Sequence, residues 1–323
     1  MNQLERRVRT LDAWQQRHRF PAFTFAVIKK FGDDQAGNLV ALLTYFAFLA
    51  TFPLLLALSG ILGMVLRGNS LLQASIQTSA LAQFPIIGTQ LGSQIGLASL
   101  GHSTPALIIG TVGAILGGRG LGNALQNTLN TLWNVPKVAR PGFPSNYLRT
   151  FGLLALLGVG TVVNTATASL VGAGETLGIS GVPSKTLAFA LSTVIGIGLF
   201  FAAFRIATAK IIATRDLLLG AILSSITWQI LLSLAGIIIS NNLKHAQALA
   251  GFFGVVLGLL AWFGLQATVT VYAIEADVVR AHHLWPRSIT QPPLTSADKE
   301  FLIEATTVEK RRPEQKIVVK FTE

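Results

Sequence analysis

The sequence contains no cysteine and unusually few charged residues. None of its 323 residues is a cysteine, which excludes disulfides, thiol catalysis and cysteine-ligated metal. Charged residues make up 12% of the chain and hydrophobic residues 51%, whereas an average soluble domain carries about a quarter charged residues. This composition disfavours a soluble enzyme and indicates an integral membrane protein.

The common sequence signatures of catalysis are also missing. The chain has no HExxH, no GxSxG and no glycine-rich phosphate loop ending in Lys-Ser or Lys-Thr. Among the five histidines, His282 and His283 are adjacent, so they point about 100° apart on a helix and form a poor metal pair. We therefore expect neither enzymatic activity, nor a cofactor, nor a metal site.

Six apolar runs divide the chain. A helix needs about 20 mostly apolar residues to cross a bilayer, and five of the runs reach or approach this length. The second run is shorter and rich in glycine, and we expect its helix to continue as a polar helix to residue 134. The expected spans are 39–66, 104–118, 150–172, 186–204, 217–239 and 248–271.

Lysine and arginine are distributed unevenly between the segments that connect these runs. Twenty-two of the 25 fall in alternate segments on one side of the six-span arrangement, and three fall on the other. Segments rich in Lys and Arg stay cytoplasmic. We therefore predict an all-α, six-transmembrane-helix bundle in the inner or plasma membrane, with both termini in the cytoplasm. No separate soluble domain remains.

Three further segments lie outside the spans. Residues 1–38 alternate basic and aromatic positions, which predicts an amphipathic helix lying in the membrane interface. Residues 68–103 form the long outside loop, which we interpret either as a packed cap or as a gate or docking surface. The tail 286–323 is expected to be largely disordered, apart from a short helix that starts at a capping box formed by Thr295 and Asp298.

Polar residues and helix-breaking residues occur at defined positions in the spans. Pro53 lies near the middle of the first span and should kink it, and the spacing of Gly113 and Gly117 suits a close helix approach. A polar stripe follows at helical spacing, and two amides lie near mid-depth in the last two spans. The polar stripe forms a polar pathway, a lipid-headgroup site or hydrogen bonds between helices, and the two amides form part of the pathway or bond between helices: Arg119, Asn123, Asn127, Asn130, Asn134, Gln229 and Gln266.

The centres of all six spans lack Asp, Glu, Lys, Arg and His. This disfavours a proton relay through carboxylates in the membrane, because such groups mark those relays. The nearest carboxylate, Glu275, follows the last span. We predict that it pairs with Arg119 or Arg205 and closes the inner mouth of the bundle.

Several segments together resemble the YihY/BrkB family of bacterial inner-membrane proteins. Ala41–Pro53 is similar to the first span of that family, and Asn123–Pro136 with the following Arg140–Phe143 to its Asn-rich segment and basic loop. Asp216–Trp228 and Leu260–Ala276 are similar to its fifth and sixth spans. The chain departs from the family pattern at Phe46, at Ala273-Ile274 and at Asp277.

The resemblance implies an envelope membrane protein that moves a lipid or small solute. Family members have been described as virulence factors and as ribonuclease BN, but no metal-binding cluster of His and Asp supports a nuclease. The alternative interpretation is a scaffolding protein that recruits envelope partners. We expect membrane lipids with anionic headgroups as partners. The net charge of +11 lies at span ends rather than in a stripe with aromatics, so we expect no nucleic acid.

Overall fold

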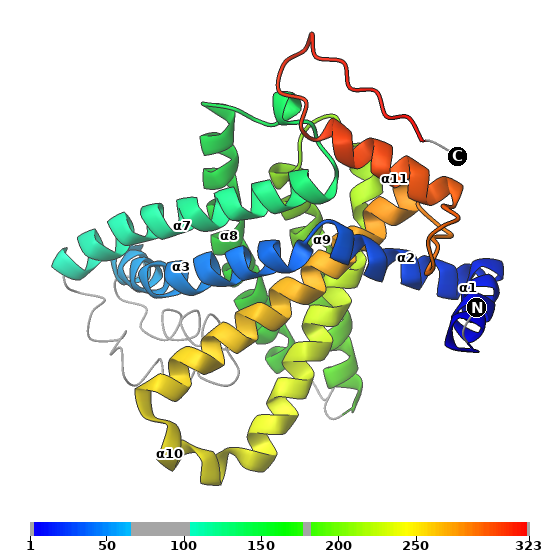
Figure 1. Ribbon diagram of the computed structural model, residues 1–323. Helices are drawn as coiled ribbons and strands as arrows, with labels where there is room; N and C mark the ends of the chain where they lie inside the picture. The colour runs from blue at the N-terminus through cyan, green and yellow to red at the C-terminus, as the bar shows by residue number, and fades with distance from the viewer. Residues whose placement is uncertain (1–2, 66–103, 177–181, 322–323) are drawn as a thin grey trace.

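The computed structural model describes residues 3–65, 104–176 and 182–321, and all regular elements in these ranges are helices (Figure 1). The expected outside loop 68–103 lies outside the described residues. The elements are α1 Gln3–Arg17, α2 Arg19–Asp33, α3 Ala36–Val65, α7 Thr104–Leu132, η1 Lys137–Ala139, α8 Ser145–Thr176, α9 Val182–Ala207, η2 Thr214–Leu217, α10 Leu218–Ala281 and α11 Ser296–Thr307.

Four stretches of the described chain are long and apolar enough to cross a membrane. They are Ala36–Ala57, Thr186–Ala207, Thr214–Ala235 and Val256–Ala281. Each overlaps one of the expected spans, because a long apolar run is a local property that the sequence displays directly. Helices α7 and α8 correspond to the remaining two expected spans, and α7 extends from the glycine-rich run through the polar stripe to Leu132.

Helices α3 and α7 lie side by side, and glycines of α7 allow the contact (Figure 1). A Cβ atom placed on Gly117 would lie 3.0 Å from Cα of Ala50, and one on Gly113 would lie 2.9 Å from Cβ of Pro53. The predicted close approach is therefore confirmed. Pro53 is accommodated within α3, which continues as one helix through it to Val65.

Helix α10 combines the fifth and sixth expected spans. Figure 1 shows it as two arms that double back on each other, with α3 crossing one of them. The prediction of a loop between these spans is wrong, since residues 240–247 are helical. The physical reason is that this stretch contains no proline or glycine to end the helix.

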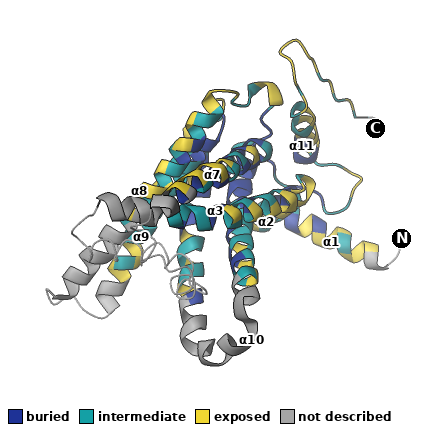
Figure 2. Cartoon of the chain, turned by 90° about the vertical axis from the view of Figure 1, so that its left-hand side faces the viewer, coloured by how far each residue is buried: buried dark blue, intermediate teal, exposed yellow. Residues whose placement is uncertain are grey.

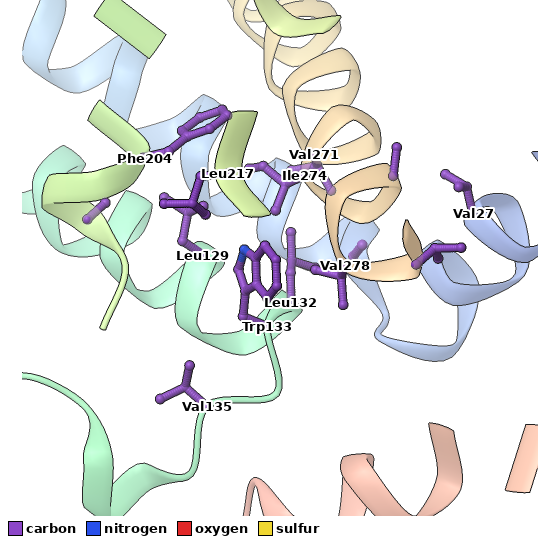
Figure 3. Packing of buried hydrophobic residues seen from close by; sticks show 14 of the residues in the cluster. Val27, Leu129, Leu132, Trp133, Val135, Phe204, Leu217, Val271, Ile274 and Val278 are labelled. Carbon is purple, nitrogen blue, oxygen red and sulfur yellow. The ribbon is translucent and has the colours of Figure 1, made fainter. Parts of the chain in front are cut away.

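The buried apolar core lies at one end of the bundle. Figure 3 shows Leu132, the last residue of α7, and Trp133, which follows it, packed near Ile274 and Val278 of α10. Val27 of α2 contributes to the same cluster. We call this the charged end, since α2, the end of α7, η2, the end of α10 and α11 bring the charged residues together there. Elsewhere, the outer faces of the long helices are exposed and apolar (Figure 2).

The two terminal segments pack on the charged end. The expected N-terminal amphipathic helix is two helices, α1 and α2, that meet at His18. The short helix expected in the tail is present as α11, which buries Ala297 and Phe301, and its predicted capping box of Thr295 and Asp298 is confirmed.

Candidate functional site

Three ionisable side chains are buried together where α2, α10 and the end of α7 meet. Lys30 belongs to α2, Asp34 follows the end of α2, and Glu275 belongs to the second arm of α10. The side chains of Lys30 and Glu275 have no exposed surface, and that of Asp34 is 7% exposed. We call Lys30, Asp34 and Glu275 the buried charge cluster.

Lys30 is the centre of this cluster. Its Nζ lies 2.9 Å from Oε2 of Glu275, donates a hydrogen bond to Asp34, and donates another, of 2.8 Å, to the carbonyl oxygen of Leu132. The contact with Glu275 is between opposite charges without hydrogen-bond geometry. Within the described residues, neither carboxylate oxygen of Glu275 has a hydrogen-bond partner. Lys30 therefore links α2 to both α10 and α7.

The charges in the cluster do not cancel. Burial acts to lower the pKa of Lys30, but the nearby carboxylates of Glu275 and Asp34 outweigh it and raise that pKa. Burial raises the pKa of Asp34, although Lys30 opposes this effect. One ammonium thus faces two carboxylates in a space closed to solvent. Such an arrangement favours the protonated form of Asp34.

Local sequence and aromatic contacts place α2 against α10. Lys30 and Asp34 are four residues apart, so they share a face at the end of α2. Gln35 adopts a φ of 49°, which turns the chain sharply into α3. Phe31 stacks on Tyr272 of α10 with ring centroids 4.2 Å apart. These features hold Lys30 at the depth of Glu275.

A second set of ionic contacts fastens the C-terminal segment to α2. Asp298 of α11 accepts hydrogen bonds from Lys29 at 2.9 Å, from Nε of Arg287 at 2.8 Å and from the backbone N–H of Ser288 at 3.0 Å. Arg287 also contacts Asp33 at 2.9 Å, and its guanidinium lies 4.4 Å from the ring centroid of Phe301. We call residues 287–301 the C-terminal latch.

Helix α1 joins the latch through Asp12. The Asp12 carboxylate accepts hydrogen bonds from the backbone N–H groups of Ile289 at 3.1 Å and Thr290 at 3.2 Å. Burial acts to raise the pKa of Asp12, but these bonds and those from neighbouring glutamine side chains outweigh it and lower the pKa. Gln15 adds a 2.7 Å bond to the carbonyl oxygen of Arg287. Both ends of the chain are thereby fixed to each other.

The predicted partner of Glu275 is wrong. Glu275 meets Lys30 of α2, because α2 packs on the face of α10 that carries Glu275. Arg119 instead donates a 2.6 Å hydrogen bond to the hydroxyl group of Tyr147. Arg205 donates to the carbonyl oxygen of Ile212 at 3.4 Å. Neither arginine has an ion pair with Glu275.

The polar stripe of α7 separates into residues with different surroundings. Asn130 is buried and connects to the chain after α9, donating to the carbonyl oxygen of Ala207 at 3.2 Å and accepting from the N–H of Ala209 at 2.9 Å. Asn127 is exposed and accepts a 3.1 Å bond from Arg140. The contacts of Asn130 match the interpretation as a hydrogen bond between helices. Asn123 is half-buried.

The two mid-depth amides lie on α10. Gln266 is 6% exposed, and its Nε2 has no hydrogen-bond partner among the described residues. Gln229 is half-buried on the other arm. The structure therefore does not bring Gln229 and Gln266 into the buried charge cluster.

Sequence reasoning missed Lys30, Asp34 and the latch. It assigned residues 1–38, which include Lys30 and Asp34, to an amphipathic helix lying in the membrane interface. The spacing of Lys30 and Asp34 by four residues was a signal of an ion pair. Nothing in the local sequence indicated that this pair would be covered by α10 and α11.

Comparison with known proteins places the chain in a family. The family model described as Virulence factor BrkB matches residues 27–295. The chain belongs to the BrkB family. It is 24% identical over 272 residues to the inner membrane protein YhjD of Escherichia coli (strain K12). The aligned region covers 80% of this chain and 80% of the relative. No solved structure matches.

The residues that match the BrkB family model include the buried charge cluster but only part of the C-terminal latch. The matched range contains the whole buried charge cluster, from Lys30 to Glu275. It ends at Thr295, so Asp298 lies beyond it, as does Asp12 at the other end. The cluster is thus built within the BrkB region, and the latch joins that region to the terminal helices.

Proposed function

We propose that this BrkB-family protein crosses the inner membrane six times and provides a pathway for a lipid or small solute, without enzymatic activity. The inner-membrane location is supported by the name of the E. coli relative. The concentration of Lys and Arg in alternate segments supports cytoplasmic termini. In this arrangement the charged end faces the cytoplasm.

The buried charge cluster carries the proposal. Removing an ion from water costs several kcal/mol even after relaxation, and packed apolar residues often stabilise a site as well as a buried ion pair does. Joining two helices through Lys30, Asp34 and Glu275, which have almost no exposed surface, therefore costs more desolvation free energy than apolar packing would. In membrane proteins, buried ionisable residues of this kind mark pathways and their gates.

The contacts of Lys30 suggest how such a gate opens. In the described structure Lys30 joins α2 to α10 through Glu275 and to α7 through the carbonyl oxygen of Leu132. Breaking these contacts releases α2 from α10 and α7. We propose that the separation of α2 from α10 opens the charged end, and that the contacts of Lys30 keep it closed.

A scaffolding role is the second candidate, and one observation favours it. Buried amides of α7 are used for packing, since Gln126 donates to Thr150 at 3.0 Å and Asn130 bonds to the end of α9. A protein that only recruits partners needs such packing and no pathway. The two candidates differ in what the purified protein does alone.

Reconstitution into vesicles distinguishes them. Vesicles would contain a fluorescent phospholipid, with a quencher added outside to measure exchange between leaflets, and a parallel set would contain a trapped small solute. We expect the protein to accelerate at least one movement over protein-free vesicles. The variant with Lys30→Met and Glu275→Gln should change that rate.

A matched control is Lys137→Gln, which removes an exposed ion pair with Glu309 and should leave the rate unchanged. Absence of any movement of lipid or solute, with correctly inserted protein, contradicts the pathway and favours the scaffold. Equal rates for the wild type and the cluster variant would retain the pathway but reject the cluster as its gate.

A further inference from the structure

A pocket of about 390 Å³ opens between α8 and the end of α9 at the charged end. Leu148, Arg149 and Gly152 of α8 line one side. Arg205 and Ile206 of α9 line the other, together with Lys210 from the chain that follows α9. The pocket is separate from the buried charge cluster, with which it shares no residue.

Two of the three cations in this pocket are held in place by backbone carbonyl groups. Arg149 donates hydrogen bonds to the carbonyl oxygens of Ile206, at 3.2 Å, and Thr208, at 2.6 Å. Arg205 donates to Ile212. A guanidinium has five N–H donors, so each retains several for a ligand. These bonds restrain both guanidinium groups before any ligand arrives, which reduces the entropy lost on binding.

The positive charge in the pocket is not neutralised by the chain. No lining residue is acidic, and Lys210 is exposed with no ion pair or hydrogen bond in the part of the chain that the structure describes. Burial, followed by the charge of Arg205, lowers the pKa of Arg149. An anion between the cations would remove this repulsion.

Exposed apolar side chains line the pocket or lie near its cations in the sequence. Leu148 is 71% exposed, Ile211 61% and Phe151 51%. On a protein that spans a membrane, this combination matches the boundary between acyl chains and headgroups, where apolar surface meets lipid and cations meet phosphate. Guanidinium groups suit phosphate, because their planar donors bind its oxygen atoms in pairs.

We propose that this pocket binds a phosphate group, carried by the headgroup of an anionic lipid. Arg149 and Arg205 hold the phosphate, Lys210 adds a third positive charge, and Leu148 contacts the start of the acyl chains. The site stands on observations independent of the buried charge cluster. It holds its ligand whether or not the protein conducts a lipid or solute.

Native mass spectrometry of the detergent-purified full chain tests this site. Phosphatidylglycerol, phosphatidylcholine and inorganic phosphate are titrated separately. We expect phosphatidylglycerol to bind at lower concentration than phosphatidylcholine. Each basic residue near an anionic lipid contributes about 1 kcal/mol, so Arg205→Gln with Lys210→Gln should weaken phosphatidylglycerol binding about 30-fold.

Arg215→Gln is the matched control. Arg215 lies in η2, its side chain is 90% exposed and it does not line the pocket, so its replacement should leave binding unchanged. The melting temperature of each variant checks the fold. If the double variant does not fold, Lys210→Gln alone decides, with an expected loss of about fivefold, since Lys210 is exposed.

The possible outcomes are distinct. Tighter binding of inorganic phosphate than of either lipid, lost in the same variants, keeps the phosphate site and assigns it to a soluble source. Equal binding of both lipids, or equal phosphatidylglycerol binding by the wild type and a folded pocket variant, overturns the proposal.

Discussion

The carboxylate of Asp277 lies against the backbone of Gly220, so the second arm of α10 covers the first turn of the first arm. A Cβ atom on Gly220 would lie 3.0 Å from both Cγ of Asp277 and the carbonyl oxygen of Ala273. Asp277 has no exposed surface. Its carboxyl group lies at the N-terminal end of the helix, whose first N–H groups have no partner within the helix and whose N-cap lacks a side-chain bond.

Gly220→Ala should therefore destabilise the protein. The added methyl group meets a backbone carbonyl and a buried carboxylate that cannot move apart freely, and overpacking of this kind costs about 1–3 kcal/mol. The melting temperature of the detergent-purified protein measures the effect. Gly198→Ala in α9 is the control, because nothing lies within 4 Å of its Cβ position. Equal melting temperatures for the two variants would contradict the close contact.

Replacing Lys30 alone should be more damaging than replacing it together with Glu275. Lys30→Met leaves the buried carboxylates of Glu275 and Asp34 without their cation, and breaking a buried ion pair costs about 3–5 kcal/mol. Adding Glu275→Gln removes one of these two charges and should recover part of that loss. Thermal unfolding of the two variants gives the comparison. If the double variant is no more stable than Lys30→Met, Lys30 stabilises the fold mainly through Asp34 and Leu132.

Gly117→Val should separate α3 from α7. The position of a Cβ atom at Gly117 is 3.0 Å from Cα of Ala50, which is backbone and cannot rotate away. We expect a lower melting temperature and greater protease sensitivity of α3. Gly158→Val in α8 introduces the same side chain where nothing lies within 4 Å, and it should have little effect. Similar losses in both variants would mean that valine itself, and not the helix contact, is responsible.

Acid should release the C-terminal latch. Burial acts to raise the pKa of Asp298, but hydrogen bonds from Lys29, Ser288 and Arg287 outweigh it and lower that pKa below its ordinary 3.8. A carboxyl group whose pKa is lowered on folding stabilises the folded state above its unfolded pKa. The stabilisation of the latch is therefore complete above about pH 4 and is lost as the pH falls further.

Hydrogen exchange of α11 from pH 7 down to about pH 1 measures this release, after correction for the pH dependence of the intrinsic exchange rate. At neutral pH, Asp298→Asn should reproduce the faster exchange seen in acid. Glu300→Gln, at an exposed position of the same helix, should not. Unchanged protection of α11 in Asp298→Asn would show that apolar contacts such as Phe301 hold the latch without the carboxylate.

The absence of cysteine allows a direct test of topology. Single cysteines at Ser79 and Asn242 should react with an impermeant thiol reagent in intact cells, since both lie in segments expected outside. Cysteines at Ser145 and Glu314 should react only after the membrane is opened. Labelling of position 145 in intact cells would overturn the proposed orientation.

The sequence predicted those parts of the fold that depend on neighbours along the chain. The positions of α3, α7, α8, α9 and α10 follow apolar runs. The close approach at Gly117 and the capping box at Thr295 follow residue spacing. The bend within α10 was expected as a loop, because a polar stretch between two apolar runs does not reveal whether the helix continues through it.

The candidate site depended on neighbours far apart in the chain. Glu275 was correctly singled out as the carboxylate at the end of the last apolar run, yet its partner was wrong. Lys30 had appeared to be one of several basic residues at a membrane surface, and only the packing of α2 on α10 removes it from solvent. A charge pattern shows which groups need partners, and it does not show which groups meet.

The amino-acid sequence by itself therefore determined the membrane class, the positions of the apolar helical stretches and the asymmetric distribution of charge, since these follow from local hydrophobicity and from residue counts. Tertiary structure decided that Lys30 pairs with Glu275, and that Lys29 meets Asp298 across a separation of 269 residues. The physical reason is that an ion pair requires two charges within about 4 Å. Such proximity is set by the way the helices pack.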